Sequence, residues 1–485
     1  MHHVKMKNKR IMKLYYSFIS SIIAILLLQS CSEKQAVVWI STTSNAVWKA
    51  HSSLQALQIK AGEQQDIEVF PEQPLQSING FGACFNELGW TSLSLLKEEQ
   101  RDSIMRELFE PGVGANFAIC RMPVGANDFS RNWYSYNETP NDFDMKNFSI
   151  ANDEETLIPF IQNAKKFNPD LKIWASPWSP PSWMKYNNHY ACHPDSAVND
   201  LKADPATKWE GKNMFIMEDR YLRAYSLYFG LFIDAYKQKD IDIYAIAPQN
   251  EFNSCQVFPS CLWKSSGLAI FIGKYLGPEM EKRGVEIMFG TMERPDEAMV
   301  DTVLTDSLAG KYVKIAGFQW AGKNALPGIY RRYPDLKLYQ TEQECGDGRN
   351  SWDGAVYSWN LMKHYLSNGV SAYDYWIISL LKGGISRWGW AQNSLVTVDP
   401  ETKSYAYTYE YYAMKHYSHF IKQGAKRLKT SGYDNIMAFA NPDNSIVIVA
   451  GNQTNKDISI NVKIGDHCIK PTLEADSFNT FLIKK

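Results

Sequence analysis

Eight short apolar runs alternate with longer amphipathic stretches through the middle of the chain. The runs cover residues 78–85, 116–125, 171–178, 243–251, 285–291, 313–320, 336–342 and 372–379. The stretches between them include two helix-like segments, residues 218–237 and 352–367. Strands that are apolar throughout and alternate with helices indicate a parallel sheet covered on both faces. Eight such units predict an α/β fold, a (β/α)8 TIM barrel, which takes about 250 residues before insertions.

Both ends of the chain differ in pattern from this central region. Residues 435–464 and 476–485 alternate apolar and polar side chains, with Asn-Pro-Asp-Asn and Asn-Gln-Thr-Asn as turn signals. This pattern predicts antiparallel strands. Two strand-like pieces near the other end, within residues 36–70, have no other partner, so we expect both chain ends to build one antiparallel β-sandwich. The expected parts are residues 32–77 for the N-terminal strands, 78–415 for the barrel and 416–485 for the C-terminal strands.

Residues 1–31 predict an export signal and not a part of the fold. A basic stretch at residues 5–13 precedes an apolar segment that ends at Cys31 and is too short for a stable membrane span. The end of this segment, LLQSC, resembles a bacterial lipobox, with Leu28 three residues before Cys31 and Ser30 directly before it. We therefore expect cleavage before Cys31, lipidation of its thiol, and anchoring to a bacterial membrane, the outer one, facing the periplasm or the surface. An ordinary signal peptide with an incidental Cys is the alternative.

Composition argues against several other kinds of partner. The net charge is −1 and no basic run is present beyond the N-terminal one, so we expect no nucleic-acid partner. Seven cysteines remain after Cys31 and none forms a CxxC pair, which fits neither a zinc site nor a disulfide scaffold. Cys255 and Cys261 are close enough in sequence to bridge, without further support. No phosphate-loop, HExxH or complete dinucleotide motif occurs, so we expect no cofactor and no metal.

Two carboxylates stand at the ends of predicted barrel strands. Glu251 ends the fourth run, directly after Asn250, and Glu342 ends the seventh. Because active sites of such barrels lie at the C-terminal strand ends, both residues are expected on one rim. Two carboxyl groups facing one glycosidic bond are what glycoside hydrolysis requires, about 5–5.5 Å apart in retaining enzymes. Glu344 is a rival to Glu342, because alternation along the strand puts both on the same side.

Tryptophans gather at the same predicted rim. Trp178 ends the third run, Trp320 the sixth, and Trp376 lies in the eighth, with Trp388 and Trp390 in the next loop. Indole rings stack on the apolar faces of sugars and offer an N–H group as well.

The loop after the second run adds Asp128, a carboxylate that can accept hydrogen bonds from sugar hydroxyls. For each of these residues a structural role is the alternative: core packing for a Trp, and an Asx-turn for Asp128.

Several motifs together resemble glycoside hydrolase family 30, the group of glucocerebrosidase and β-1,6-glucanases. They are INGFGACFNE, RMPVGANDFSRNWYSYNETPNDFDMKNFSI, WASPWSPPSWMK, APQNEF, LYQTEQECGDG and the C-terminal strands. The resemblance implies a barrel completed by a β-sandwich from both chain ends, and a retaining mechanism. It implies that Glu251 is the acid/base, that Glu342 and not Glu344 is the nucleophile, and that Asn250 holds the sugar 2-hydroxyl. It also implies that Asp128, Trp178 and Trp376 bind the sugar before the cleaved bond.

Two segments depart from the glucocerebrosidase pattern. The sixth strand ends in Gln319-Trp320-Ala321 where glucocerebrosidase has His-Trp-Tyr, and the loop at residues 386–394 also differs. The missing Tyr would contact the nucleophile, so another group must orient Glu342. These loops shape the leaving-group side, and their composition favours a sugar over a ceramide.

We therefore expect a retaining β-glycoside hydrolase acting on β-1,6-glucan. The alternatives are a glucosylceramidase, an exo-β-glucosidase, a β-fucosidase or a β-xylosidase. A different class, an inactive surface glycan-binding lipoprotein, would keep the tryptophans but would be free to lose either Glu251 or Glu342.

Overall fold

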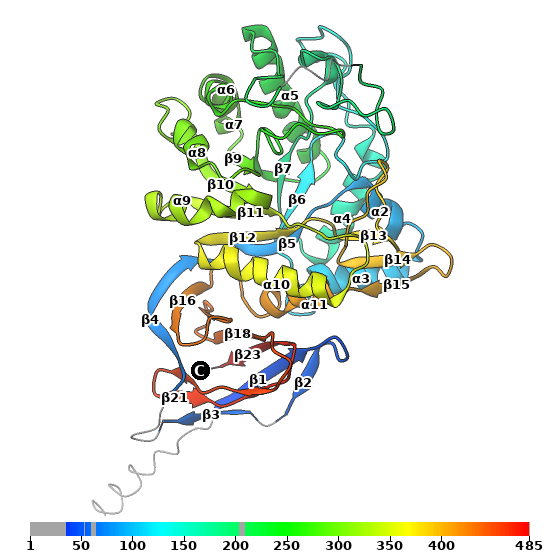
Figure 1. Ribbon diagram of the computed structural model, residues 1–485. Coiled ribbons are helices and arrows are strands. Elements are labelled where there is room, and N and C mark those ends of the chain that lie inside the picture. The colour runs from blue at the N-terminus through cyan, green and yellow to red at the C-terminus, as the bar shows by residue number, and fades with distance from the viewer. Residues whose placement is uncertain (1–34, 53, 60–64, 203–208, 485) are drawn as a thin grey trace, which may run out of the picture.

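A computed structural model shows a barrel of strands and helices above a separate β-sheet domain (Figure 1). The structure describes residues 35–52, 54–59, 65–202 and 209–484, so the predicted signal segment and Cys31 lie outside the described residues. Within the described part, no helix is long and apolar enough to span a membrane.

Eight parallel strands form the barrel predicted from the apolar runs. The strands are β5 (Gly80–Ala83), β6 (Ile119–Pro123), β7 (Lys172–Ser176), β8 (Ile243–Ile246), β9 (Glu286–Met292), β10 (Val313–Gln319), β11 (Lys337–Glu342) and β12 (Val370–Tyr375). They pair in the order β5-β12-β11-β10-β9-β8-β7-β6, and a parallel bridge between Cys84 and Arg121 joins the two outer strands. The interior is filled by side chains from β6 to β12, among them Ile119, Trp174, Ala245, Met288, Ile315, Tyr339 and Ala372. The prediction of a TIM barrel is confirmed.

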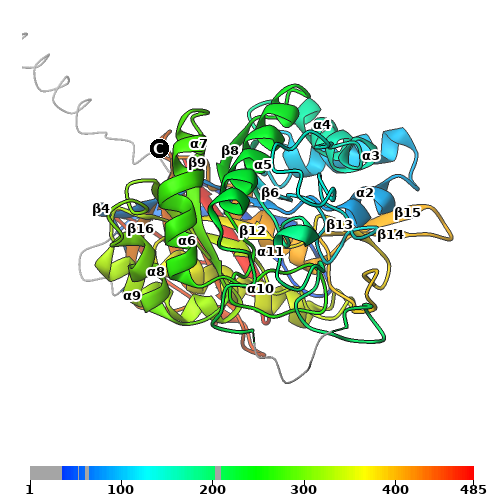
Figure 2. The same ribbon diagram turned by 90° about the horizontal axis from the view of Figure 1, so that it is seen from above.

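Helices surround these strands (Figure 2). They are α2 (Glu87–Leu93), α3 (Glu98–Phe109), α4 (Leu157–Phe167), α5 (Asp219–Lys237), α6 (Ser265–Phe271), α7 (Gly277–Glu281), α8 (Glu297–Leu304), α9 (Leu326–Arg332), α10 (Trp352–Ser367) and α11 (Tyr409–Ser418). Shorter helical turns are η1 (Asp153–Glu155), η2 (Ser182–Met184), η3 (Ile272–Leu276) and η4 (Trp320–Asn324). In α5, Tyr225, Tyr228, Phe232 and Tyr236 recur every three or four residues and are fully buried. That spacing places them on the one helix face that packs on the barrel.

The two chain ends share a ten-stranded sheet below the barrel (Figure 1). Its order is β2 (Lys49–His51), β1 (Gln35–Thr42), β23 (Ser477–Ile483), β18 (Ile446–Asn452), β17 (Ile436–Ala440), β16 (Lys426–Ser431), β4 (Ile67–Ser77), β20 (Val462–Ile464), β21 (His467–Ile469) and β3 (Gln55–Gln58). An additional pairing of β1 with β3 folds the sheet back on itself around its own apolar core. The expectation that both ends build one side domain is confirmed. The sheet departs from a fully antiparallel arrangement in one place, because β20 pairs with β4 in parallel.

Helix α11 connects the barrel to this sheet through a buried histidine. The Nδ1 atom of His416 lies 2.9 Å from the Thr480 hydroxyl on β23, and its Nε2 atom lies 2.9 Å from the Thr42 hydroxyl on β1. Burial lowers the pKa of His416 to about 3, so the ring is neutral in the folded protein. One side chain therefore contacts a strand from each end of the chain.

Smaller elements complete the structure. A three-stranded sheet follows the last barrel strand and consists of β13 (Ser379–Leu381), β14 (Val396–Asp399) and β15 (Ser404–Tyr407), and a two-stranded one joins β19 (Ile458–Ser459) to β22 (Thr472–Leu473). Cys255 and Cys261 are both free thiols, so the bridge that their spacing would allow is not formed.

Candidate active site

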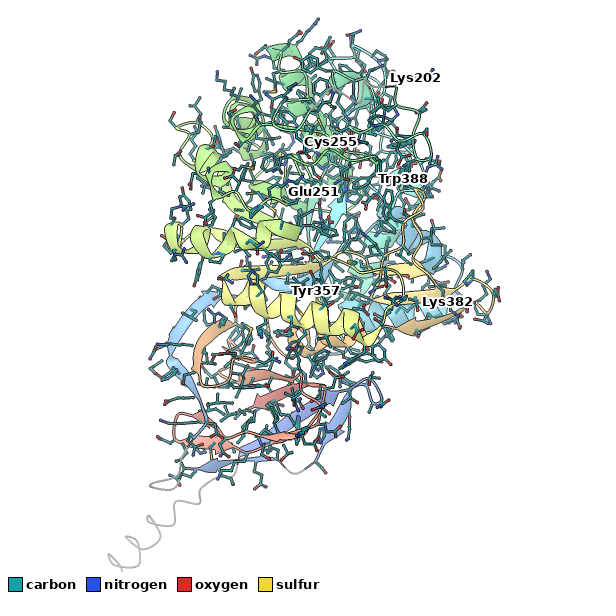
Figure 3. The ribbon with its side chains drawn as sticks, viewed as in Figure 1. Lys202, Glu251, Cys255, Tyr357, Lys382 and Trp388 are labelled. Atoms are coloured by element: carbon teal, nitrogen blue, oxygen red, sulfur yellow. The ribbon has the colours of Figure 1, made fainter. Side chains whose placement is uncertain are left out.

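The two predicted carboxylates line one cavity at the C-terminal ends of the barrel strands. Glu251 lies on the side of the barrel away from the ten-stranded sheet (Figure 3). Strand β8 ends at Ile246, so Glu251 lies in the turn beyond it, with a left-handed φ of 43° that non-glycine residues seldom adopt. Strand β11 ends with Glu342 itself. One nitrogen, Nε2 of Gln319, lies 3.1 Å from Glu251 Oε1 and 3.2 Å from Glu342 Oε2. Because both oxygens lie within 3.2 Å of the same nitrogen, the distance between them is less than 6.4 Å, twice the longer nitrogen–oxygen distance.

Glu342 is held by three donors, which come from β6, from β10 and from the turn η4 that follows β10. Arg121 Nη1 donates to its Oε2 at 2.8 Å and Gln319 Nε2 to the same oxygen at 3.2 Å. The indole Nε1 of Trp320 donates to Oε1 at 3.1 Å. Burial raises the pKa of Glu342 above its usual range, although the guanidinium of Arg121 and these hydrogen bonds act in the opposite direction and favour the ionised form. Gln319 and Trp320 thus orient this carboxylate in a chain that lacks the tyrosine of glucocerebrosidase.

Glu251 has a different electrostatic environment. Burial raises the pKa of Glu251 well above its usual range, and the nearby negative charge of Glu342 raises it further. The hydrogen bond that Gln319 donates to Glu251 lowers this pKa, but it is a smaller influence than burial. No cation is among the groups that shift the pKa of Glu251 most. Of the two carboxyl groups, Glu251 is therefore the one that keeps its proton.

Arg121 organises the floor of the site, although sequence reasoning passed over it. Its Nη2 donates to Asn250 Oδ1 at 2.6 Å and to the Ser176 hydroxyl at 2.9 Å, in addition to the bond to Glu342. The guanidinium also lies over the Trp178 ring, 4.4 Å from its centroid. The signal was present in the sequence, because an arginine within a fully apolar strand must be paired when the strand is buried.

Asn250 has its carbonyl oxygen occupied by protein donors. Besides Arg121, the Thr291 hydroxyl donates to that oxygen at 2.9 Å. Because the oxygen is used in this way, the amide NH2 group is left to face the cavity that Asn250 lines.

Asp128 is buried at the wall of the same cavity. Its Oδ1 atom has no hydrogen-bond partner within the described residues. Burial raises the pKa of Asp128 well above its usual range, and the charge of Glu342 adds to that shift. A buried carboxylate oxygen without a partner costs free energy unless a ligand supplies a donor. The hydroxyl of a bound sugar is a donor of this kind.

The cavity above these groups has a volume of about 470 Å³. The predicted residues in its wall are Asp128, Trp178, Asn250, Glu251, Trp320, Glu342 and Trp390. Trp376 is not in the wall; it lies behind Trp178, with ring centroids 5.2 Å apart, and is almost fully buried. Trp388 likewise supports Trp390 from behind, at 6.1 Å, without lining the cavity.

Glu344, the rival to Glu342, lies outside this cavity. It lines a neighbouring hollow of about 410 Å³, and its Oε1 accepts a bond from Lys323 at 2.6 Å. Alternation could not separate the two glutamates because the strand stops at Glu342, so Glu344 is not part of it.

The wall also contains residues that the sequence reasoning did not select. They are Ser254, Gln256, Phe258, Glu293, Arg294, Ala321 and Gln392. Glu293 directly follows β9, so the rule that selected Glu251 and Glu342, a carboxylate at a strand end, would have found it. Within the described residues, no cluster of side chains suits a metal ion.

Comparison with known families assigns the chain. The model of the glycosyl hydrolase family 30 TIM-barrel domain matches residues 78–421, and that of the family 30 β-sandwich domain matches residues 424–481. The chain belongs to glycoside hydrolase family 30. It is a glycosidase, a hydrolase acting on glycosidic bonds.

Relatives and solved structures agree with this assignment. The chain is 25% identical over 448 residues to lysosomal acid glucosylceramidase of Mus musculus, covering 86% of this chain and 82% of that protein. It is 26% identical over 427 residues to endo-1,6-β-D-glucanase of Neurospora crassa, covering 82% and 83%. The crystal structure of SrfJ from Salmonella typhimurium shares the fold at a TM-score of 0.82 and 23% identity, covering 93% of this chain and all of that one. The endo-β1,6-glucanase BT3312 does so at 0.78 and 24%, with the same coverage.

Proposed function

We propose that this family 30 enzyme is a retaining β-glycoside hydrolase that cleaves β-1,6-glucan by double displacement. The observation that carries the mechanism is the shared hydrogen bond of Gln319, which keeps one oxygen of Glu251 and one of Glu342 less than 6.4 Å apart. Retaining glycosidases place their carboxyl groups about 5–5.5 Å apart, and inverting ones about 6.5–9.5 Å apart to admit a water molecule. The bound here fits the retaining class.

In the first step, Glu342 attacks the anomeric carbon while Glu251 protonates the leaving oxygen. The Arg121 contact favours the ionised nucleophile, and the burial of Glu251 favours the protonated acid. A covalent glycosyl–enzyme forms, and the leaving alcohol departs.

In the second step, Glu251, now ionised, removes a proton from water, which attacks the anomeric carbon and releases Glu342. The product keeps the β configuration. Because the two carboxyl groups interact, the bell-shaped pH profile should be described by pKa values of the pair.

Support for a glucan comes from the polarity of the cavity and from the relatives. Asp128 and the amide of Asn250 offer an acceptor and a donor for sugar hydroxyls, and Trp178 offers an indole face. Proteins named as endo-1,6-β-D-glucanases match over four-fifths of this chain, as do glucosylceramidases.

We also propose that the enzyme is exported and lipid-anchored through Cys31. The support is the basic, apolar and LLQSC pattern of residues 1–31. Metabolic labelling with a radioactive fatty acid should mark the wild type and not the Cys31→Ser variant. Equal labelling of both would overturn the anchor.

The test of the function is hydrolysis of a linear β-1,6-glucan by the chain without residues 1–31. We expect soluble products from the wild type, with β-configured ends by NMR, and none from Glu342→Gln. The Glu251→Gln variant should still cleave a glucoside with an activated aryl leaving group, since such a group needs no proton. Activity on glucosylceramide alone would replace the substrate, and inverted product would refute the mechanism.

A further inference from the structure

A third carboxylate lies in the catalytic cavity with no role in double displacement. Glu293 follows strand β9, lines the cavity wall and is only 3% exposed. Its Oε2 lies 3.0 Å from Arg294 Nη1, and the Ser254 side chain also lies beside the carboxylate. Its Oε1 is buried without a hydrogen bond of good geometry to any described residue. Arg294 in turn lies 3.4 Å from Glu210, whose side chain is exposed and does not line this cavity.

Such an arrangement costs the protein stability unless a ligand completes it. A buried carboxylate whose hydrogen-bonding capacity is not filled pays the desolvation cost of that group. Burial raises the pKa of Glu293 to about 7, because the desolvation that makes the ionised carboxylate costly also favours its protonated form. A ligand in the cavity that donates hydrogen bonds to Glu293 would recover this cost, because Glu293 lines the cavity wall.

Strand β9, which ends directly before Glu293, lies beside the acid, because the Glu251 N–H donates to the Thr291 hydroxyl of this strand at 3.1 Å. The charge of Glu293 raises the pKa of Glu251 and is not among the leading influences on Glu342. For Asp128, Glu342 is the charge that acts most strongly, and Glu293 is not among the leading influences. Asp128 therefore lies nearer the nucleophile and Glu293 nearer the acid.

The acid contacts the leaving oxygen, so groups beside it face the leaving group. Ser254, Gln256 and Phe258, on the chain segment that follows Glu251, also line the cavity, and the Ser254 side chain contacts Glu293. Arg294 offers a donor and Glu293 an acceptor in this wall.

We propose that Glu293 and Arg294 bind the hydroxyl groups of the leaving-group sugar, so that this enzyme is selective for a carbohydrate leaving group over an apolar one. The inference rests on the proposed function, in which Glu251 is the acid. Glu293 is an acceptor for one sugar hydroxyl, and Arg294 fixes the carboxylate and donates to another oxygen of the same sugar unit.

The test compares one variant on two leaving groups. Glu293→Gln should lower kcat/KM for a β-1,6-linked gluco-oligosaccharide about 10- to 100-fold, the range for losing a hydrogen bond to a charged group. The same variant should change kcat/KM for an aryl β-glucoside less than threefold, because an aryl group offers no hydroxyls. Glu210→Gln is the matched control, since Glu210 contacts Arg294 but does not line this cavity. In this variant, kcat/KM for both substrates should stay within twofold of the wild-type value.

A pH profile on the aryl substrate separates binding from a purely structural effect. Three carboxylates act on Glu251, namely Glu342, Glu293 and Asp128, whereas Arg294 and Glu210 are the charges beside Glu293. Removing the charge of Glu293 should move the basic limb of the profile to lower pH. Equal losses on both substrates with an unmoved basic limb would overturn the proposal.

The outcomes also separate this inference from the proposed substrate. If the wild type cleaves another oligosaccharide but no β-1,6-linked one, and Glu293→Gln loses that activity selectively, the leaving-sugar site stands and the linkage falls. If β-1,6-glucan is cleaved and Glu293→Gln changes kcat/KM equally for both leaving groups, the proposed function is supported and the leaving-sugar site is refuted. If no oligosaccharide is cleaved, both are refuted.

Discussion

Replacing Trp320 by Phe removes one of the three donors that hold Glu342, and its effect can be estimated from the structure. The indole Nε1 lies 3.1 Å from Glu342 Oε1, and that oxygen has no other donor within the described residues. A hydrogen bond to a charged group contributes about 1.5–3 kcal/mol. Because Trp320 is 37% exposed, we take the lower end of this range.

This energy translates into a shift of one limb of the pH profile. One pKa unit corresponds to about 1.4 kcal/mol, so the loss raises the pKa of Glu342 by about one unit. The direction follows because the donor stabilises only the ionised form, which its loss destabilises. The acidic limb of kcat/KM should therefore move up by about one pH unit, with a smaller change on the plateau.

The assay is the pH dependence of kcat/KM on an aryl β-glucoside, with Trp390→Phe as the control. Trp390 lines the same cavity and packs against Phe258, with ring centroids 5.2 Å apart, and it does not donate to Glu342. An acidic limb that stays in place for Trp320→Phe, or that moves equally in both variants, would show that the indole N–H does not hold the nucleophile.

Two further predictions concern stability. Arg121→Met leaves the buried charge of Glu342 unpaired, so the free energy of unfolding by urea should fall by about 3–5 kcal/mol, and a loss below about 1 kcal/mol would contradict the role of Arg121 as organiser. The depressed pKa of His416, about 3, means that its contribution to stability is complete above about pH 6.5 and is lost as the pH falls towards 3. When the pH falls from 6.5 to 4.5, the free energy of unfolding of His416→Gln should therefore decrease by up to about 3 kcal/mol less than that of the wild type. Parallel curves of unfolding free energy against pH would refute this.

The fold was predictable from the sequence because its signals are local and repeated. Each barrel strand is a short apolar run, and burial on both faces makes such runs stand out against the helices between them. The joining of both chain ends was predictable for a different reason: the early strands had no other partner. The parallel pairing of β20 with β4 was not, since it depends on how the sheet folds back on itself.

Part of the site was hidden from sequence reasoning for physical reasons. Alternation failed to separate Glu342 from Glu344 because it holds only within a strand, and the end of a strand is set by tertiary packing. The position of Trp376 behind Trp178 is a matter of packing depth, which periodicity does not encode. Arg121 and Glu293, in contrast, carried visible signals, a charge within an apolar run and a carboxylate at a strand end.

The pairing of β1 with β23 has a consequence for how the protein is made. The Trp39 indole donates to Asn479 across 440 residues of chain, and β23 lies between β1 and β18 in the sheet. The side domain therefore cannot close until the last strand has left the ribosome, and until then β1 and β18 present unpaired edges that are prone to aggregate. A chain that ends before β23 would lose a strand from inside this sheet and not from its edge. The side domain that packs against the barrel therefore forms only after β23 has been synthesised.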